Sequence, residues 1–171
     1  MNLEEKIRTI KDFPKEGIEF KDITTLLKDP EAYQATIQKF VERYQDQEID
    51  VVVGIEARGF LVGAPLALEL GKSFVPARKE GKLPAEVVRA EYDLEYGSNI
   101  LEIHKDALEE GQKVLIIDDL LATGGTVKAT ADLIQEIGGE IVELAFLLEL
   151  GFLGGRDQLV DYDIYSIIIE D

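Results

Sequence analysis

Residues 113–126 read KVLIIDDLLATGGT and join a run of aliphatic residues to two adjacent acids and a glycine turn. Residues 114–117 are all aliphatic, as expected of a parallel strand that is covered on both faces. Asp118 and Asp119 follow at the carboxyl end of this predicted strand, where open α/β sheets bind ligands. We therefore expect a parallel sheet with a ligand site beside the two acids.

The turn after the acids consists of small and hydroxyl-bearing residues: Ala122, Thr123, Gly124, Gly125 and Thr126. Small side chains let a phosphate approach the backbone, so that several N–H groups can point at it. A helix predicted over residues 126–137 adds the positive end of its dipole. The spacing differs from the nucleoside-triphosphate P-loop and from the dinucleotide Gly-x-Gly-x-x-Gly pattern. The turn is therefore predicted to bind a sugar phosphate.

Strands and helices alternate along most of the chain. Asp29 and Pro30 are residue types favoured at a helix start, and apolar residues then recur at helical spacing as far as Tyr44. The predicted strands cover residues 49–55, 73–77, 113–118, 140–148 and 164–169, and the later helices cover residues 60–70 and 126–137. This alternation is typical of a parallel sheet with right-handed crossovers.

Residues 87–103 break the alternation. Apolar and polar residues alternate on both sides of a loop at residues 92–99, which predicts two antiparallel arms. Arms that project from a parallel core are a candidate lid, here over residues 88–100.

The composition limits the classes of function. The chain has 171 residues, of which 46% are hydrophobic, and this suits one globular domain. It has no cysteine, which excludes thiol nucleophiles, disulfides and cysteine metal sites, and its one histidine cannot form a histidine cluster. A formal charge of −17 disfavours nucleic-acid binding. With neither a signal peptide nor an apolar run of ~20 residues, we expect a cytoplasmic protein without membrane contacts.

A second loop, residues 54–60, reads GIEARGF and lies between a predicted strand and a predicted helix. It should flank the same ligand as the glycine turn, because parallel strands end at one edge of the sheet. Arg58 is the candidate anion-binding side chain, since a guanidinium pairs bidentately with phosphate oxygens. The alternative for Arg58 is a surface ion pair. Other cations are concentrated further along, at Arg78, Lys79, Lys82 and Arg89.

Residues 118–126 closely resemble the phosphoribosyl-diphosphate motif of the type I phosphoribosyltransferases. The resemblance implies an α/β, Rossmann-like parallel-sheet core in which Asp118 and Asp119 hold the ribose hydroxyls, partly through Mg²⁺. The metal would be held mainly by the substrate, with the two acids as candidate indirect ligands. The glycine turn, residues 122–126, would bind the 5′-phosphate.

The family resemblance also assigns the second loop to pyrophosphate. Glu56, Ala57 and Arg58 would bind it, with a cis peptide bond between Glu56 and Ala57. Lys79 and Lys82 would stabilise the departing diphosphate together with Arg58. Arg78 would contribute as well, by reaching across a homodimer interface.

Five blocks of the sequence together are similar to the members of this family that use adenine. They cover residues 13–24, 54–60, 78–84, 94–97 and 118–126, in the family's order. The resemblance implies purine salvage, in which adenine and phosphoribosyl diphosphate give AMP and pyrophosphate. It also implies a single domain, in which a hood at residues 1–28 adjoins a core at residues 29–171.

Adenine would stack on Phe20, while the backbone of Glu19 reads the purine edge. Lys21, beside them, stands where other members have arginine. From its sequence context alone, Phe20 could equally be a core residue. Glu95 in the lid matches the glutamate proposed in the family as the proton acceptor for the purine, and would act with Arg58. The alternative for Glu95 is a solvated surface carboxylate.

The sequence alone is compatible with two other functions. A phosphoribosyltransferase for hypoxanthine, guanine or xanthine would share the fold and both loops. A non-catalytic regulator that senses phosphoribosyl diphosphate would share the ribose-phosphate site, but it would also bind RNA or DNA, which the acidic composition disfavours.

Overall fold

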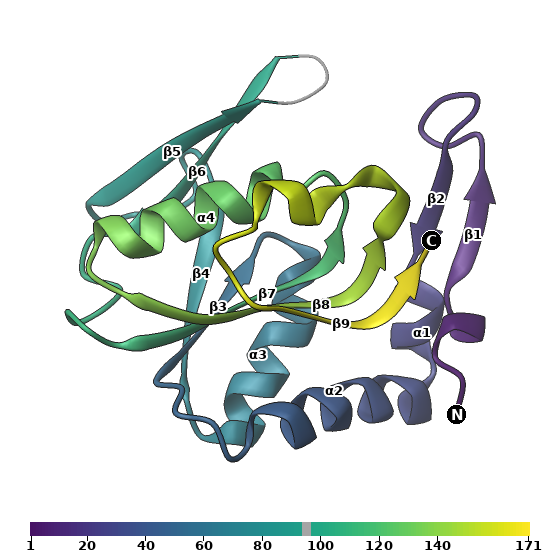
Figure 1. Ribbon diagram of the computed structural model, residues 1–171, viewed down its shortest axis with the longest axis horizontal. Coiled ribbons are helices and arrows are strands. Elements are labelled where there is room, and N and C mark those ends of the chain that lie inside the picture. The colour runs from purple at the N-terminus through teal and green to yellow at the C-terminus, as the bar shows by residue number, and fades with distance from the viewer. Residues whose placement is uncertain (94–96) are drawn as a thin grey trace.

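The computed structural model describes residues 1–93 and 97–171 (Figure 1). The strands are β1 (Arg8–Lys11), β2 (Glu19–Asp22), β3 (Val51–Ile55), β4 (Ser73–Lys79), β5 (Val87–Asp93), β6 (Ser98–His104), β7 (Lys113–Leu121), β8 (Glu140–Leu150) and β9 (Ile164–Glu170). The α-helices are α1 (Thr24–Lys28), α2 (Pro30–Tyr44), α3 (Arg58–Leu70) and α4 (Gly125–Glu136). Short 3₁₀ helices are η1 (Glu4–Lys6), η2 (Gly151–Leu153) and η3 (Gly155–Gln158).

The predicted parallel α/β fold is confirmed. Among the described residues, seven strands form one sheet in the order β5-β6-β4-β3-β7-β8-β9. The strands from β4 to β9 in this order pair in parallel, while β5 and β6 pair antiparallel with each other and β6 pairs antiparallel with β4. The predicted antiparallel arms are therefore present as β5 and β6, which extend away from the parallel core (Figure 1). Part of the predicted loop between them, residues 94–96, lies outside the described residues.

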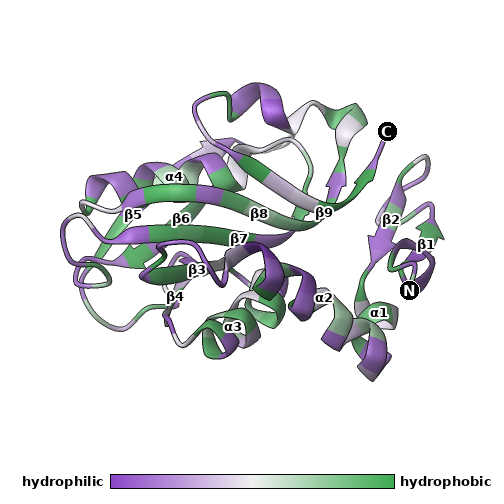
Figure 2. Cartoon of the chain, turned by 60° about the horizontal axis from the view of Figure 1, so that its bottom comes forward, coloured by the Kyte–Doolittle hydropathy of each residue, from purple (hydrophilic) through white to green (hydrophobic). Residues whose placement is uncertain are grey.

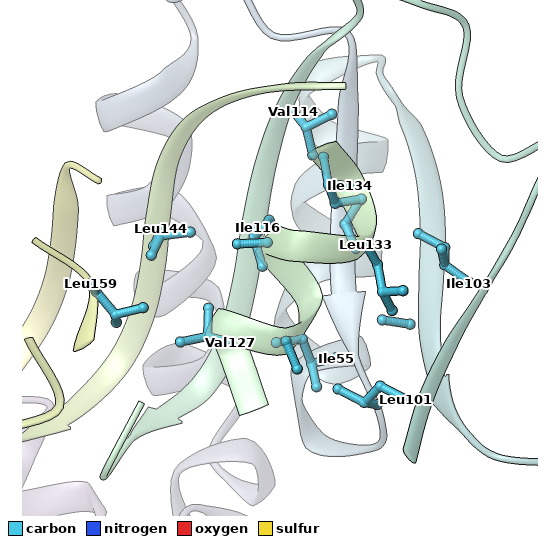
Figure 3. Packing of buried hydrophobic residues seen from close by; sticks show 14 of the residues in the cluster. Ile55, Leu101, Ile103, Val114, Ile116, Val127, Leu133, Ile134, Leu144 and Leu159 are labelled. Carbon is cyan, nitrogen blue, oxygen red and sulfur yellow. The ribbon is translucent and has the colours of Figure 1, made fainter. Parts of the chain in front are cut away.

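The aliphatic run of β7 is explained by helices on both faces of the sheet. Val114 and Ile116 pack in one cluster with residues of α4, such as Leu133 (Figure 3). Leu115 and Ile117 point to the other face, into a cluster with residues of α2 and α3. Successive side chains of a strand alternate between faces, so a strand covered on both sides needs apolar residues throughout. Figures 1 and 2 show the two helical layers and the apolar residues along β3 and β7.

β7 is longer than the sequence predicted. It continues to Leu121 rather than ending at residue 118, so Asp118 and Asp119 both lie inside the strand. The pairing of β3 with β7 ends at Ile117, whereas β8 pairs with β7 as far as Leu121. Asp118 and Asp119 thus follow the point at which β7 loses its pairing with β3. The sheet is open on that side of β7, and the site is built there.

The N-terminal segment packs on the last two strands of the sheet. Leu3, Ile23 and Leu26 form a buried cluster with residues of β8 and β9, such as Leu148 and Ile168. β1 and β2 form an antiparallel hairpin, which was not predicted from the sequence, and it stands beside the C-terminus (Figure 1). Within residues 1–93 and 97–171, no helix is long and apolar enough to cross a membrane.

The base of the hairpin is held by charged groups. Asp22 accepts hydrogen bonds from the hydroxyl and backbone N–H of Thr24 and from the guanidinium of Arg8. These bonds, with that of the Thr24 hydroxyl foremost, lower the pKa of Asp22 to about 2. These bonds join the base of the hairpin to the start of α1, and the ion pair of Lys21 with Glu170 joins the hairpin to β9.

Candidate active site

A cavity of ≈ 270 Å³ lies at the carboxyl ends of β3 and β7. The sequence-predicted residues that line it are Glu56, Ala57, Arg58, Lys79, Asp118, Asp119, Ala122, Thr123, Gly124, Gly125 and Thr126. They come from three places: the loop after β3, the end of β4, and β7 with the turn that follows it. The structure thus brings both predicted loops and the paired acids to one cavity.

Two helices begin at this cavity. α3 starts at Arg58 and α4 starts at Gly125, and in neither case does the N-cap residue, Ala57 or Gly124, cap the helix with its side chain. The N–H groups of a first helical turn have no acceptor within the helix, and the dipole gives that end a partial positive charge. Two uncapped helix starts at one cavity therefore favour an anionic ligand, such as a phosphate.

Gly124 has a backbone conformation that other residues rarely adopt, with φ at +90°. A Cβ atom at this position would also lie 2.6 Å from the carbonyl oxygen of Gly155, which is closer than two such atoms approach. Glycine is thus required at position 124 for two independent reasons, conformation and space.

The paired acids differ in their contacts. Asp119 is buried, and its Oδ2 lies 2.8 Å from Nε of Arg58, while its backbone N–H donates to Oδ1 of Asp118 at 2.8 Å. Loss of water raises the pKa of Asp118 well above its usual value, and the neighbouring Asp119 raises it further. Burial also raises the pKa of Asp119, but Arg58 opposes this. The pair is therefore short of cationic or hydroxyl partners, which a ribose or a metal ion would supply.

Arg58 also connects the cavity to the hairpin. Its guanidinium carbon lies 5.5 Å from the centre of the Phe20 ring, at cation–π distance. Phe13 packs edge-on against Phe20, with ring centres 5.2 Å apart. Phe20 is therefore a neighbour of the site rather than a residue of the main core.

The other two residues assigned to adenine lie differently. Lys21 points away from Phe20, as neighbours on a strand do, and forms an ion pair of 2.7 Å with Glu170 and a hydrogen bond to Thr9. Glu19 is exposed at the start of β2. The structure thus places Phe20 near Arg58, but it does not bring the Lys21 side chain to them.

Glu56 fixes the loop after β3 to the end of β4. Its Oε2 accepts a hydrogen bond of 2.6 Å from the backbone N–H of Lys79, and its Oε1 lies 3.4 Å from Nη2 of Arg78. Lys79 lines the cavity, whereas Lys82 is exposed in the turn after β4 and is not part of the lining. The peptide bond between Glu56 and Ala57 is cis, as the family resemblance implied.

The lining also includes five residues that were not predicted as site residues from the sequence: Tyr92, Asn99, Leu120, Leu121 and Val127. Tyr92 and Asn99 line the cavity from β5 and β6, where they face each other in register. Tyr92 and Asn99 both lie within the predicted lid. Two polar residues next to the loop, one on each arm, are the sequence feature that could have identified them. Glu95 lies outside the described residues.

Comparisons with known proteins point to one family. The family model of the phosphoribosyl transferase domain matches residues 22–170. An adenine phosphoribosyltransferase of Clostridium novyi (strain NT) is 58% identical over 171 residues, which is 100% of this chain and 99% of that protein.

Solved structures give the same result. The crystal structure of adenine phosphoribosyltransferase from Thermoanaerobacter pseudethanolicus has a TM-score of 0.95 and 54% identity, and the match covers 99% of this chain and 100% of that chain. The enzyme of Saccharomyces cerevisiae, complexed with an imino-altritol bisphosphate and adenine, has a TM-score of 0.91 and 40% identity, with coverage of 96% and 95%.

Proposed function

The chain belongs to the phosphoribosyltransferase family, in its adenine phosphoribosyltransferase branch, and from this premise we propose how its residues carry out the reaction. The enzyme transfers the 5-phosphoribosyl group from phosphoribosyl diphosphate to adenine, giving AMP and pyrophosphate in purine salvage. The observation that carries the proposal is the single cavity at which two uncapped helix starts, Arg58 and the paired acids meet.

The glycine turn, residues 122–126, binds the 5′-phosphate through backbone N–H groups and the hydroxyls of Thr123 and Thr126. The start of α4 supports this role, since anions bind at helix N-termini. Asp118 and Asp119 accept hydrogen bonds from the ribose hydroxyls. Their position beside the turn on β7 suits a ribose attached to that phosphate.

The diphosphate lies between the two helix starts, where Glu56, Ala57 and Arg58 form the loop that receives it. Negative charge accumulates on the leaving group as its bond to the anomeric carbon breaks. Arg58 and Lys79 stabilise that charge from the cavity wall. Lys82 is assigned to the same task from the turn after β4.

We assign Mg²⁺ as the cofactor, because the donors at the cavity are carboxylate oxygens, which this ion prefers. Asp118 and Asp119 would hold it indirectly, with most ligands supplied by the substrate. In the described part of the chain no group of three or more His, Cys, Asp or Glu side chains is arranged for a metal ion. When bound, the ion neutralises charge on the diphosphate.

The enzyme is further proposed to act as a cytoplasmic homodimer, in which Arg78 reaches the partner's site. Arg78 supports this role because it lies beside the cavity wall, and its Nε is buried without a hydrogen-bond partner among the described residues. Sedimentation at micromolar concentration should give twice the mass of the chain. A monomer with full activity would refute the dimer and the role of Arg78 across it.

Phe20 is proposed to stack on adenine, with the Glu19 backbone at the purine edge and the hood at residues 1–28 closing that side. The side chain of Lys21 instead ties the hood to β9 through Glu170. Replacing Phe20 with alanine should raise KM for adenine about 5- to 100-fold, because stacking on an aromatic ring stabilises a base by roughly 1–3 kcal/mol.

The measurement is the initial rate as a function of each substrate. KM for phosphoribosyl diphosphate should change much less than KM for adenine. The matched control is Phe20→Tyr, which keeps the aromatic face and should keep adenine affinity. Equal changes in both KM values for Phe20→Ala would show that Phe20 only supports the hood.

Glu95 is proposed as the proton acceptor for the purine, in a lid formed by residues 88–100. A carboxylate that accepts a proton in the transition state contributes about 10²- to 10⁴-fold in rate. Replacing Glu95 with glutamine should therefore lower kcat by about 10²-fold or more, while affinity for phosphoribosyl diphosphate changes little. Single-turnover rates would measure this, and an unchanged rate would remove Glu95 from the mechanism.

A further inference from the structure

The glycine turn rests on a second segment of the chain, residues 151–158, which contains η2 and η3. A Cβ atom at Gly155 would lie 2.4 Å from the carbonyl oxygen of Ala122, and one at Gly124 would lie 2.6 Å from that of Gly155. The two backbones are therefore in direct contact, beside the start of α4 (Figure 1). Gln158 adds a hydrogen bond of 2.9 Å from its Nε2 to the carbonyl oxygen of Thr123.

An ion pair between the half-exposed Arg156 and the buried Glu149 fixes this segment to the sheet. Arg156 donates from Nε to Oε1 of Glu149 at 2.6 Å and from Nη2 to Oε2 at 2.7 Å. The hydroxyl of Ser166 on β9 donates to the same carboxylate at 2.6 Å. Glu149 is buried on β8, directly opposite Leu121, the last residue of β7. The pair thus joins the segment to the strand end from which the glycine turn departs.

The apolar side of the segment is fixed as well. Leu159, the residue after η3, is buried in the same cluster as Val127 of α4 (Figure 3). The position of the segment is therefore determined by an ion pair on one side and by the core on the other.

This ion pair adds little net stability, because the cost of removing the Glu149 carboxylate from water offsets much of its attraction to Arg156. Bidentate geometry does fix the direction of both groups. The ion pair therefore fixes the orientation of residues 151–158. The contacts of Gly155 and Gln158 then hold the glycine turn, residues 122–126, against this segment.

We propose that Arg156, acting through Glu149, and Gln158 are positioning residues for the binding of the 5′-phosphate. They hold residues 122–124 in the shape that directs the backbone N–H groups of the turn at the phosphate oxygens. None of residues 149–158 belongs to the described lining of the cavity, so their action is indirect. The inference rests on the proposed role of residues 122–126 in phosphate binding.

The chain provides a matched control for Arg156. Arg43 forms a bidentate pair with Glu143, also on β8, at 2.6 and 3.2 Å. The side chains in the two pairs are similarly exposed, 47% and 5% for Arg156 and Glu149 against 43% and 7% for Arg43 and Glu143. The Arg43 pair lies toward the opposite end of β8, and neither of its residues lines the cavity. Loss of either pair should destabilise the fold, but only one pair contacts the segment under the turn.

The test compares Arg156→Ala, Gln158→Ala and Arg43→Ala with the wild type. Dissociation constants for ribose 5-phosphate and AMP, both KM values and the melting temperature are measured for each. Arg156→Ala should weaken ribose 5-phosphate and AMP binding about 10-fold or more, since small displacements of binding groups have effects of this size. Gln158→Ala, which leaves the ion pair intact, should weaken it about two- to tenfold.

Arg43→Ala should lower the melting temperature at least as far as Arg156→Ala does, yet leave phosphate affinity within about twofold, since additive effects are the rule for distant sites. Equal affinities for ribose 5-phosphate in wild type, Gln158→Ala and Arg156→Ala would overturn the inference alone. Equal losses of ribose 5-phosphate affinity in Arg156→Ala and Arg43→Ala would also overturn the inference alone. A wild-type protein that binds neither ribose 5-phosphate nor AMP would overturn the proposed phosphate site, and the inference with it.

Discussion

Replacing Arg58 with alanine is expected to lower kcat/KM by about 10²- to 10³-fold, the effect of removing one group that stabilises developing charge. Arg58 lines the cavity at the first position of α3, beside the proposed diphosphate. Arg58 also pairs with Asp119 and lies over Phe20. It therefore adjoins the proposed sites of the diphosphate, the ribose and adenine.

The loss of activity in Arg58→Ala should exceed the loss caused by replacing an ordinary surface arginine. Without Arg58, the buried carboxylate of Asp119 loses its cationic partner, and its pKa rises further because the largest interaction that opposes burial is lost. Arg43→Ala is the matched control, because Arg43 also pairs with a buried carboxylate, that of Glu143, and does not line the cavity. Initial rates at varied phosphoribosyl diphosphate give the measurement. An Arg58→Ala enzyme as active as Arg43→Ala would contradict the assignment.

Replacing Asp119 with asparagine is expected to raise KM for phosphoribosyl diphosphate about 10- to 100-fold. A carboxylate makes charge-assisted hydrogen bonds to ribose hydroxyls, and such bonds contribute roughly 1.5–3 kcal/mol. The amide keeps the shape of the side chain but loses the charge that holds Arg58 at 2.8 Å. The substitution should therefore weaken ribose binding and also disturb the orientation of Arg58.

The experiment also tests the magnesium assignment. KM for phosphoribosyl diphosphate is measured over a range of free Mg²⁺ for the wild type, Asp119→Asn and Asp132→Asn. Asp132 receives the same substitution on an exposed turn of α4, where it pairs with Lys128, and it should behave as the wild type. The wild-type KM should fall as Mg²⁺ rises, and less so for Asp119→Asn. A KM that does not depend on Mg²⁺ in any of the three would refute the cofactor.

The sequence was sufficient for the elements that local pattern determines. The aliphatic run of β7 and the helical spacing of α2 predicted a sheet covered on both faces, and both clusters of β7 are present. The glycine turn and the loop of Arg58 were placed at one edge by the rule that parallel strands end together. Local pattern could not give the full length of β7, because its last residues are ordered by pairing with β8.

Features that depend on distant contacts were not predictable in the same way. The β1–β2 hairpin has only short, mostly exposed strands, and its place depends on contacts with β9, such as that of Lys21 with Glu170. The direction of the Lys21 side chain likewise followed from strand pairing and not from the motif. The adjacent glycines 154 and 155 were a visible sign of close backbone approach, but their partner, the glycine turn, lies about thirty residues earlier in the chain.

Adenine specificity is the central claim, and a panel of bases tests it most directly. Pyrophosphate release is measured with phosphoribosyl diphosphate, Mg²⁺ and adenine, hypoxanthine, guanine or xanthine in turn. We expect adenine to give equimolar AMP and pyrophosphate at an initial rate at least about 10²-fold above that of any other base, since a site that hydrogen-bonds one base leaves polar groups unpaired with another. Product from another base without product from adenine would contradict the account.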